Sequence, residues 1–163
     1  MKRLALATLV AAAIAGTAAP SPAPAASRST IAYAASVLAG ERVTVSCVRN
    51  LRWGGKSALG LVGYTEWSDG SVEIEDHIDL HAMICRILAG GPDQLYQGIP
   101  YTGTGEAVLT VAHESAHVRG ILNERKAECW GLRNVKRTAI LLGFYSRDLG
   151  LIVRQAREAT TCR

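Results

Sequence analysis

The sequence predicts a small α+β domain in which a short N-terminal β-hairpin layer packs on a C-terminal helical half. Two observations favour this class. The first half of the chain holds short runs of alternating or β-branched residues between Gly-containing turns. From Gly105 onward, apolar residues recur at helical spacing. The chain has 163 residues, which suits one domain.

The N-terminal segment has the composition of a secretory signal peptide. It opens with Lys and Arg, Leu4–Ala15 is almost entirely apolar, and Gly16–Ala26 is rich in Ala and Pro. This order of charged, apolar and small-residue regions is typical of a signal. The apolar stretch is too short for a membrane span, which needs about 20 residues. We therefore expect a signal over residues 1–26, with Ala23-Pro24-Ala25 as one cleavage motif and cleavage after Ala18 as the alternative.

Residues 41–163 are assigned to a single domain, preceded by a loosely ordered linker over residues 27–40. Within this linker, Ser29–Leu38 either forms a short helix or stays loose. Arg42–Val48 alternates with β-branched residues and is predicted to be a strand. Asn50–Ser57 contains a Gly pair and is predicted to be a loop.

The predicted hairpin comes next. Gly60–Trp67 and Ser71–Ile74 are strand-like runs that flank Ser68-Asp69-Gly70. Asp-Gly between two such runs is a strong hairpin signal, because the turn needs a positive φ angle.

The rest of the chain is predicted to be mainly helical, with Gly or Gly-Pro sequences at the helix ends. The predicted helices cover Leu80–Leu88, Glu106–Val118, Glu124 to about Leu142, and Arg147–Thr160. Asn123 is placed to cap the third of these helices, Gly120 to end the second and Gly143 to end the third. Gln94–Gly103 looks irregular.

The four cysteines predict a disulfide framework, because an even number of cysteines in an exported chain usually pairs. Three pairings exist. We favour Cys47–Cys85 with Cys129–Cys162, since each bond then closes one half of the chain. A metal site made of cysteines would need close Cys-x-x-Cys spacing, which is absent.

Charge and hydropathy exclude two classes of partner. The net charge of +4 includes two basic residues of the predicted signal, and the other Lys and Arg residues are scattered among acids. This pattern does not support nucleic-acid binding. Arg119, Arg125, Arg133 and Arg137 are most simply a solvated face of the C-terminal helices. No later stretch is apolar for long enough to insert stably into a membrane, and we expect a monomer.

A candidate metal site lies in the predicted helix Glu106–Val118. The run His113-Glu114-Ser115-Ala116-His117 places two histidines one helical turn apart, so both imidazoles can bind one zinc ion. Glu114 lies beside them, where it can act as a general base for an activated water. Apolar neighbours indicate a buried helix, and buried ionisable groups need partners.

A catalytic zinc needs a third protein ligand, and Glu124 is the preferred candidate. The spacing of the metzincins would place that ligand at position 123, but Asn123 is a poor zinc ligand. Glu128, one turn after Glu124, is the alternative ligand. Both acids also suit a helix N-terminus, whose dipole favours negative charge.

The run from Asn123 to Glu128 resembles the zinc-ligand segment of gluzincin metallopeptidases, including the thermolysin-like enzymes. It is also similar to small secreted actinobacterial proteins that carry an H-E-x-x-H helix followed closely by E-x-x-A-[DE]-C. The resemblance covers about residues 113–129, and the linker between His117 and Glu124 is much shorter than in thermolysin. It implies that Glu124 binds zinc and that the carboxylate of Glu128 hydrogen-bonds and orients a zinc-bound histidine.

Together these features predict a secreted zinc-dependent metallopeptidase acting on a peptide or protein. Two alternatives stay open: a domain that zinc stabilises without catalysis, and a metal-free, disulfide-stapled binding domain. His77, Asp79 and His81 form a second polar group that lacks a clear further ligand, and we expect them to be exposed polar residues.

Overall fold

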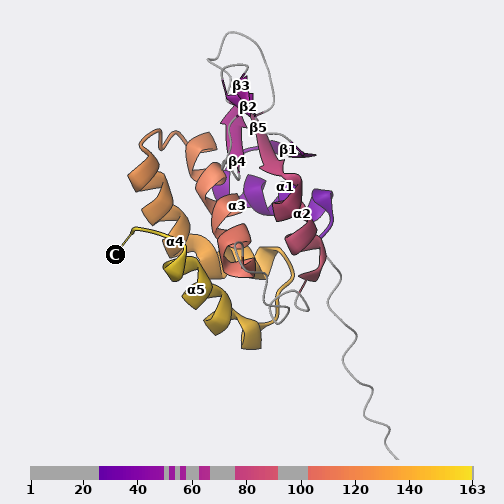
Figure 1. The fold of residues 1–163 in the computed structure, drawn as a ribbon, viewed down its shortest axis with the longest axis vertical. Coiled ribbons are helices and arrows are strands. Elements are labelled where there is room, and N and C mark those ends of the chain that lie inside the picture. The colour runs from indigo at the N-terminus through magenta and orange to yellow at the C-terminus, as the bar shows by residue number, and fades with distance from the viewer. Residues whose placement is uncertain are drawn as a thin grey trace, which may run out of the picture.

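The computed structural model describes residues 26–49, 52–53, 56–57, 63–66, 76–91 and 103–162. Its elements form a helical half and a small sheet, so the α+β class is confirmed in its broad form. Figure 1 shows α3 in the middle of the molecule, with α4 and α5 on one side and α1, α2 and the sheet on the other. Residues 1–25 of the predicted signal (residues 1–26), the run Ser71–Ile74 and residues 94–102 lie outside the described residues.

Helix α3 (Thr104–Val118) is the centre of the fold. Nearly every side chain along it is buried, because α1, α2, α4, α5 and the sheet all contact it. A helix surrounded in this way is buried on all faces, which explains why its buried residues follow no single stripe. The helix begins two residues before the predicted Glu106 and ends at the predicted Val118.

Helices α4 (Glu124–Leu141) and α5 (Leu149–Glu158) pack against α3, close to the predicted bounds. The Asn123 side chain caps α4 as expected, accepting a hydrogen bond from the N–H of Lys126 at 3.0 Å. A short 3₁₀ turn, η2 (Ser146–Asp148), precedes α5, so the last helix begins later than predicted.

Helix α1 (Arg28–Ala39) lies in the predicted linker over residues 27–40, so of the two alternatives for Ser29–Leu38 the structure has the helix. Ser27 caps its N-terminus, Gly40 ends it, and one face packs into the core through the buried residues Ile31, Ala34, Ala35, Leu38 and Ala39. Ala26 is also buried, and its N–H donates a hydrogen bond to the Leu88 carbonyl at 3.4 Å. Ala26, the last residue of the predicted signal, therefore packs against the folded core.

The sheet differs from the predicted hairpin layer. It has the order β1 (Val43–Val48), β5 (Asp76–His81), β4 (Gly63–Glu66), with β1 parallel and β4 antiparallel to β5. The partner of β4 among the described residues is thus residues 77–80 and not the expected Ser71–Ile74. Ile78 and Leu80 face the core, while the alternate positions of β5 are polar.

Two smaller elements also depart from expectation. Part of the predicted loop Asn50–Ser57 forms a short antiparallel ladder of β2 (Arg52–Trp53) and β3 (Lys56–Ser57). Helix α2 (Ala82–Ala89) begins after β5, so the first two residues of the predicted helix Leu80–Leu88 are strand.

Both favoured disulfides, Cys47–Cys85 and Cys129–Cys162, are present. The first joins β1 to α2, and the second ties the segment after α5 to α4. Within the described residues, no helix combines the length and hydropathy that a membrane span requires.

Candidate metal centre

The C-terminal half of α3 carries the central residues of the site. His113 and His117 lie four residues apart and therefore on one face of the helix. Glu114 and His117 are buried, with 5% and 7% of their surface exposed, and the His113 side chain is 21% exposed. Three ionisable groups at this depth need polar partners, because burial without partners costs several kcal/mol.

A tight turn after α3 brings the third group to the two histidines. Gly120 has a φ angle of +87°, its N–H donates to the His117 carbonyl at 2.8 Å, and the N–H of Ile121 donates to the Ala116 carbonyl at 2.9 Å. These two bonds form a Schellman motif, which ends a helix and reverses the chain. Helix α4 then begins at Glu124, so the short linker is long enough to return this carboxylate to α3.

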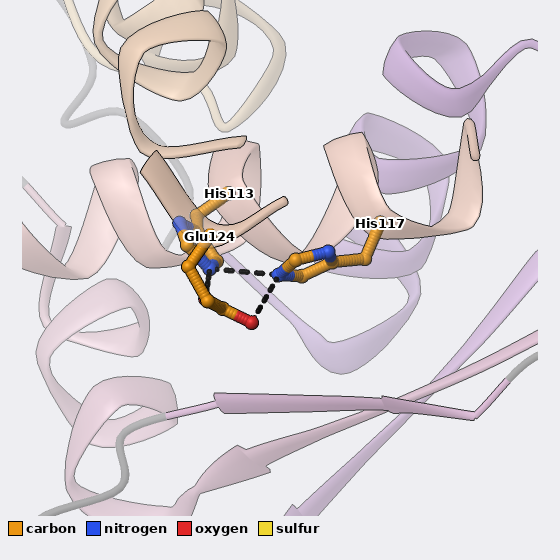
Figure 2. Close-up of side chains that lie close together, drawn as sticks. All are labelled: His113, His117 and Glu124. Carbon is orange, nitrogen blue, oxygen red and sulfur yellow. Dashed lines mark hydrogen bonds and ion pairs between the residues drawn. The ribbon is translucent and has the colours of Figure 1, made fainter. Parts of the chain in front are cut away.

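The side chains of His113, His117 and Glu124 converge (Figure 2). The two Nε2 atoms lie 3.0 Å apart, Glu124 Oε2 lies 3.1 Å from His113 Nε2, and Glu124 Oε1 lies 3.4 Å from His117 Nε2. Donor atoms on one tetrahedral zinc ion are about 3.4 Å apart, given bond lengths of about 2.1 Å. The three groups therefore form a triangle only slightly tighter than one face of such a tetrahedron.

The protonation of the histidines also suits a metal. The Ile121 carbonyl can only accept a hydrogen bond, so His117 Nδ1, 2.9 Å away, must carry a hydrogen. In the neutral ring, Nε2 then keeps the lone pair that a metal needs. Burial and the neighbouring His117 lower the pKa of His113 despite the nearby carboxylate of Glu124, which favours the neutral ring. Two imidazoles and one carboxylate are a common set of zinc ligands.

Glu114 does not join this triangle but lies against strand β4. Its Oε2 is 2.6 Å from Thr65 Oγ1, and the same hydroxyl lies 3.2 Å from the Glu114 carbonyl. A Cβ atom added to Gly63 would come within 2.5 Å of Glu114 Oε1, so the strand backbone passes directly over the carboxylate. Burial raises the pKa of Glu114 to about 7, although Thr65 and His117 act in the opposite direction.

Thr65 can pair with either form of Glu114. When Glu114 is ionised, the Thr65 hydroxyl donates to the carboxylate. When Glu114 is protonated, its O–H donates to Thr65 Oγ1, and the hydroxyl hydrogen is free to turn to the Glu114 carbonyl. The contact therefore satisfies the side chain before and after it takes up a proton.

Glu128 occupies a different place from the one that the gluzincin resemblance implies. Its Oε1 accepts a hydrogen bond from the Thr161 N–H at 3.3 Å and its Oε2 one from the Thr161 hydroxyl at 3.1 Å. Burial raises the pKa of Glu128, but hydrogen bonds from Thr160 and Thr161, with the charge of His113, outweigh it and lower the pKa. Between the two candidate third ligands, Glu124 meets the histidines, and Glu128 binds the segment that Cys129–Cys162 holds to α4.

The second polar group lies on the face of the sheet opposite to Ile78 and Leu80. His77 Nδ1 is 2.6 Å from Thr44 Oγ1 and its Nε2 is 3.1 Å from Asp79 Oδ1, while His81 Nδ1 accepts from the N–H of Met83. The polar atoms of these residues thus form hydrogen bonds with neighbouring side chains and with the backbone. His113, His117 and Glu124 are the one group among the described residues with metal-binding geometry.

Sequence reasoning missed three contributors to the site: Gly63, Thr65 and Ile121. Thr65 lies 49 residues before Glu114, and no local pattern links the two. Ile121 contributes its carbonyl, which any residue type would provide.

Comparisons with known proteins identify no relative, so a function can be proposed only from the residues of the site. No protein-family model matches the chain, and neither a curated protein nor a solved structure matches it.

Proposed function

We propose that this chain is an exported zinc-dependent hydrolase of the metallopeptidase type. The observation that carries the proposal is the convergence of three donor groups, from His113, His117 and Glu124, within 4.8 Å of one another. Glu114 lies one residue from the first donor, in a buried position with a raised pKa. Three protein ligands beside a carboxylate base are the donor pattern of catalytic zinc sites, whereas structural sites use four protein ligands.

Each side chain then has a defined task. Zinc, when bound by His113, His117 and Glu124, supplies a Lewis acid that polarises a carbonyl and lowers the pKa of water. Glu114 accepts a proton from the attacking water and returns it to the leaving amine. A pKa of about 7 suits both transfers, because a group that takes and gives a proton works best when its pKa is near the ambient pH.

Strand β4 supplies the means to hold a peptide. It lies at the edge of the sheet order β1-β5-β4, and within the described residues no other strand pairs with its outer side. An extended substrate that adds to this edge would align its backbone beside Glu114. The side chain of Thr65 faces Glu114, so the strand that binds the peptide would also orient the base.

Two further features support the proposal: the signs of export and the resemblance to gluzincins. Two disulfides are typical of proteins from oxidising compartments, in keeping with the signal-like N-terminal segment. The order of His113, His117 and Glu124 along the chain resembles the ligand order of gluzincins. The tight turn at Gly120 supports this likeness, because it allows the short linker to return Glu124 to the histidines.

The test is hydrolysis of a mixed peptide library by the purified chain with and without zinc. Cleavage should require zinc, stop on chelation and return on readdition. Glu114→Gln should bind zinc and fail to cleave, because the amide cannot take the proton. Zinc binding that raises stability without cleavage would favour a zinc-stabilised domain, and a fully folded chain that binds no zinc would favour a metal-free binding domain.

A further inference from the structure

A groove on the outer side of α4 is lined by none of the three candidate metal ligands. Its volume is about 490 Å³, within the range of about 300–1,000 Å³ typical of ligand pockets. Its lining includes Trp130 on α4 and Ile121 from the turn that follows α3. The buried residues of α4, among them Ala127, Gly131 and Val135, mark the side that faces α3. The groove therefore lies on the face of α4 turned away from α3.

The charges around this groove have one sign. Arg125, Lys126 and Arg133 line it. All three side chains are exposed, as are Lys136 and Arg137 further along the helix. Both acids of α4 lie elsewhere, Glu124 at the metal centre and Glu128 against Thr161. Within the described part of the chain, no acid forms an ion pair with the three lining cations.

Trp130 gives the groove lining an apolar surface. Trp130 is half-buried, and the guanidinium of Arg119 lies 6.0 Å from the centre of its ring. Arg119 is itself held by the Leu38 and Ala39 carbonyls, at 3.3 and 3.4 Å. Beyond the groove, the same face of α4 presents Ile140, which is 55% exposed. An aromatic surface framed by cations binds anionic ligands that also carry an apolar group.

We propose that this groove binds an acidic peptide segment that carries an apolar side chain. The apolar side chain would pack on Trp130 and Ile121, and the flanking carboxylates would pair with Arg125, Lys126 and Arg133. Charge complementarity favours this occupant, since the three cations attract acidic side chains and repel basic ones. A peptide fits better than a bare anion because Trp130 and Ile121 add apolar surface to the lining. The solvated face expected of these arginines thus acquires a binding role, and this role does not depend on catalysis.

The experiment uses the Glu114→Gln chain, so that a labelled peptide stays intact, and measures binding by fluorescence anisotropy. The probe carries a Leu flanked by Asp and Glu residues. Two comparison peptides replace the acids by Lys or the Leu by Ser. The acidic Leu peptide should bind, the Lys peptide should not, and the Ser peptide should bind more weakly. Equal binding of the Leu and Ser peptides, or none of the acidic peptide, would overturn the proposal.

Matched charge reversals locate the site. Arg125→Glu with Arg133→Glu should weaken binding by at least about tenfold, because like charges then face each other. Arg154→Glu with Arg157→Glu changes the net charge equally at exposed positions on α5 outside the groove, and should change binding less than about twofold. An equal loss of peptide binding in the two double variants would mean that overall charge, and not the groove, attracts the peptide. Melting curves of both pairs confirm that they fold.

Discussion

Thr65 Oγ1 lies 2.6 Å from Glu114 Oε2, and this hydrogen bond joins the edge strand β4 to the middle of the H-E-x-x-H run. Both residues are buried, with 4% and 5% of their surface exposed. A buried carboxyl of this kind is sensitive to a single partner, because water cannot replace a lost hydrogen bond. The contact therefore makes β4 part of the proposed site and leads to two of the predictions below.

Thr65→Val should destabilise the zinc-free protein by about 1–3 kcal/mol, the cost of leaving a buried polar group without its partner. Valine has nearly the same shape and suits a strand, so the change tests the hydroxyl alone. Because the Thr65 hydrogen bond lowers the pKa of Glu114, its loss should raise that pKa further. Denaturant unfolding measures the first effect and carboxyl NMR shifts the second. Thr65→Ser, which keeps the hydroxyl, should lie close to the wild type; equal effects of Val and Ser would show that the hydroxyl is not responsible.

The contribution of Glu114 to the stability of the zinc-free protein should fall as the pH rises from about 4.5 to about 7. Burial raises the pKa of Glu114 from 4.5 to about 7, so the folded state holds a proton that the unfolded state has released in this window. Stability falls with pH wherever the folded state binds more protons, and the full effect is about 3 kcal/mol.

Glu114→Gln isolates this contribution. The lowered pKa of His113 acts in the opposite direction, because the folded state then binds fewer protons as the pH falls through its range. The difference in unfolding free energy between wild type and Glu114→Gln is therefore the informative quantity. It should change by about 3 kcal/mol between about pH 4.5 and pH 7. A difference that stays constant with pH would rule out a buried, protonated Glu114.

Substituting one of the proposed zinc ligands should lower the zinc affinity far more than substituting Glu128. His113→Ala, His117→Ala and Glu124→Gln should each weaken zinc binding by more than about 100-fold, the most that is lost when a residue that only orients a ligand is changed. Glu128→Gln should change it less than about tenfold and mainly lower stability, because Glu128 binds Thr161. Competition with a chromophoric chelator measures both. A larger loss with Glu128→Gln than with Glu124→Gln would exchange the roles of the two acids.

Gly120→Ala should cost about 1–2 kcal/mol of stability, because a φ angle of +87° is strained for any residue with a Cβ atom. A Cβ at Gly120 would meet nothing within 4 Å, so the cost is purely conformational. Zinc affinity should fall as well, since the turn returns Glu124 to the histidines. Gly150→Ala in α5, also with open space around it, is the control and should be neutral or slightly stabilising. Thermal melts with and without zinc compare the two, and an unchanged zinc affinity in Gly120→Ala would separate the turn from the site.

Sequence patterns predicted the helical half well, because helix caps and helix-ending glycines act on the residues next to them in the chain. Asn123 and Gly120 act through their own backbone neighbourhood, and the helices that they bound follow the expected ranges closely. Helix α1 carried comparable signals: Ser27 at its start, Gly40 at its end, and apolar residues at helical spacing. The Ala- and Pro-rich sequence before it made a linker look more natural than a helix.

The sheet was harder to predict because its pairing is not local. Strand β5 has only two apolar residues, Ile78 and Leu80, and its end merges with the helical pattern that follows. Its parallel pairing with β1 joins residues about thirty positions apart, which no turn sequence specifies. The same holds for Thr65 and Glu114. The spacing of His113 and His117 already placed these two candidate ligands on one helix face, but the contact between Thr65 and Glu114 depends on the tertiary fold.

The most direct measurement is a zinc-edge anomalous difference map from crystals of the chain grown with zinc. We expect one zinc peak bounded by His113 Nε2, His117 Nε2 and the Glu124 carboxylate, with no protein ligand in its fourth position. Soaking out the zinc with a chelator should remove the peak. A fully folded chain with no zinc peak at these residues, or a peak at His77, Asp79 and His81 instead, would contradict it.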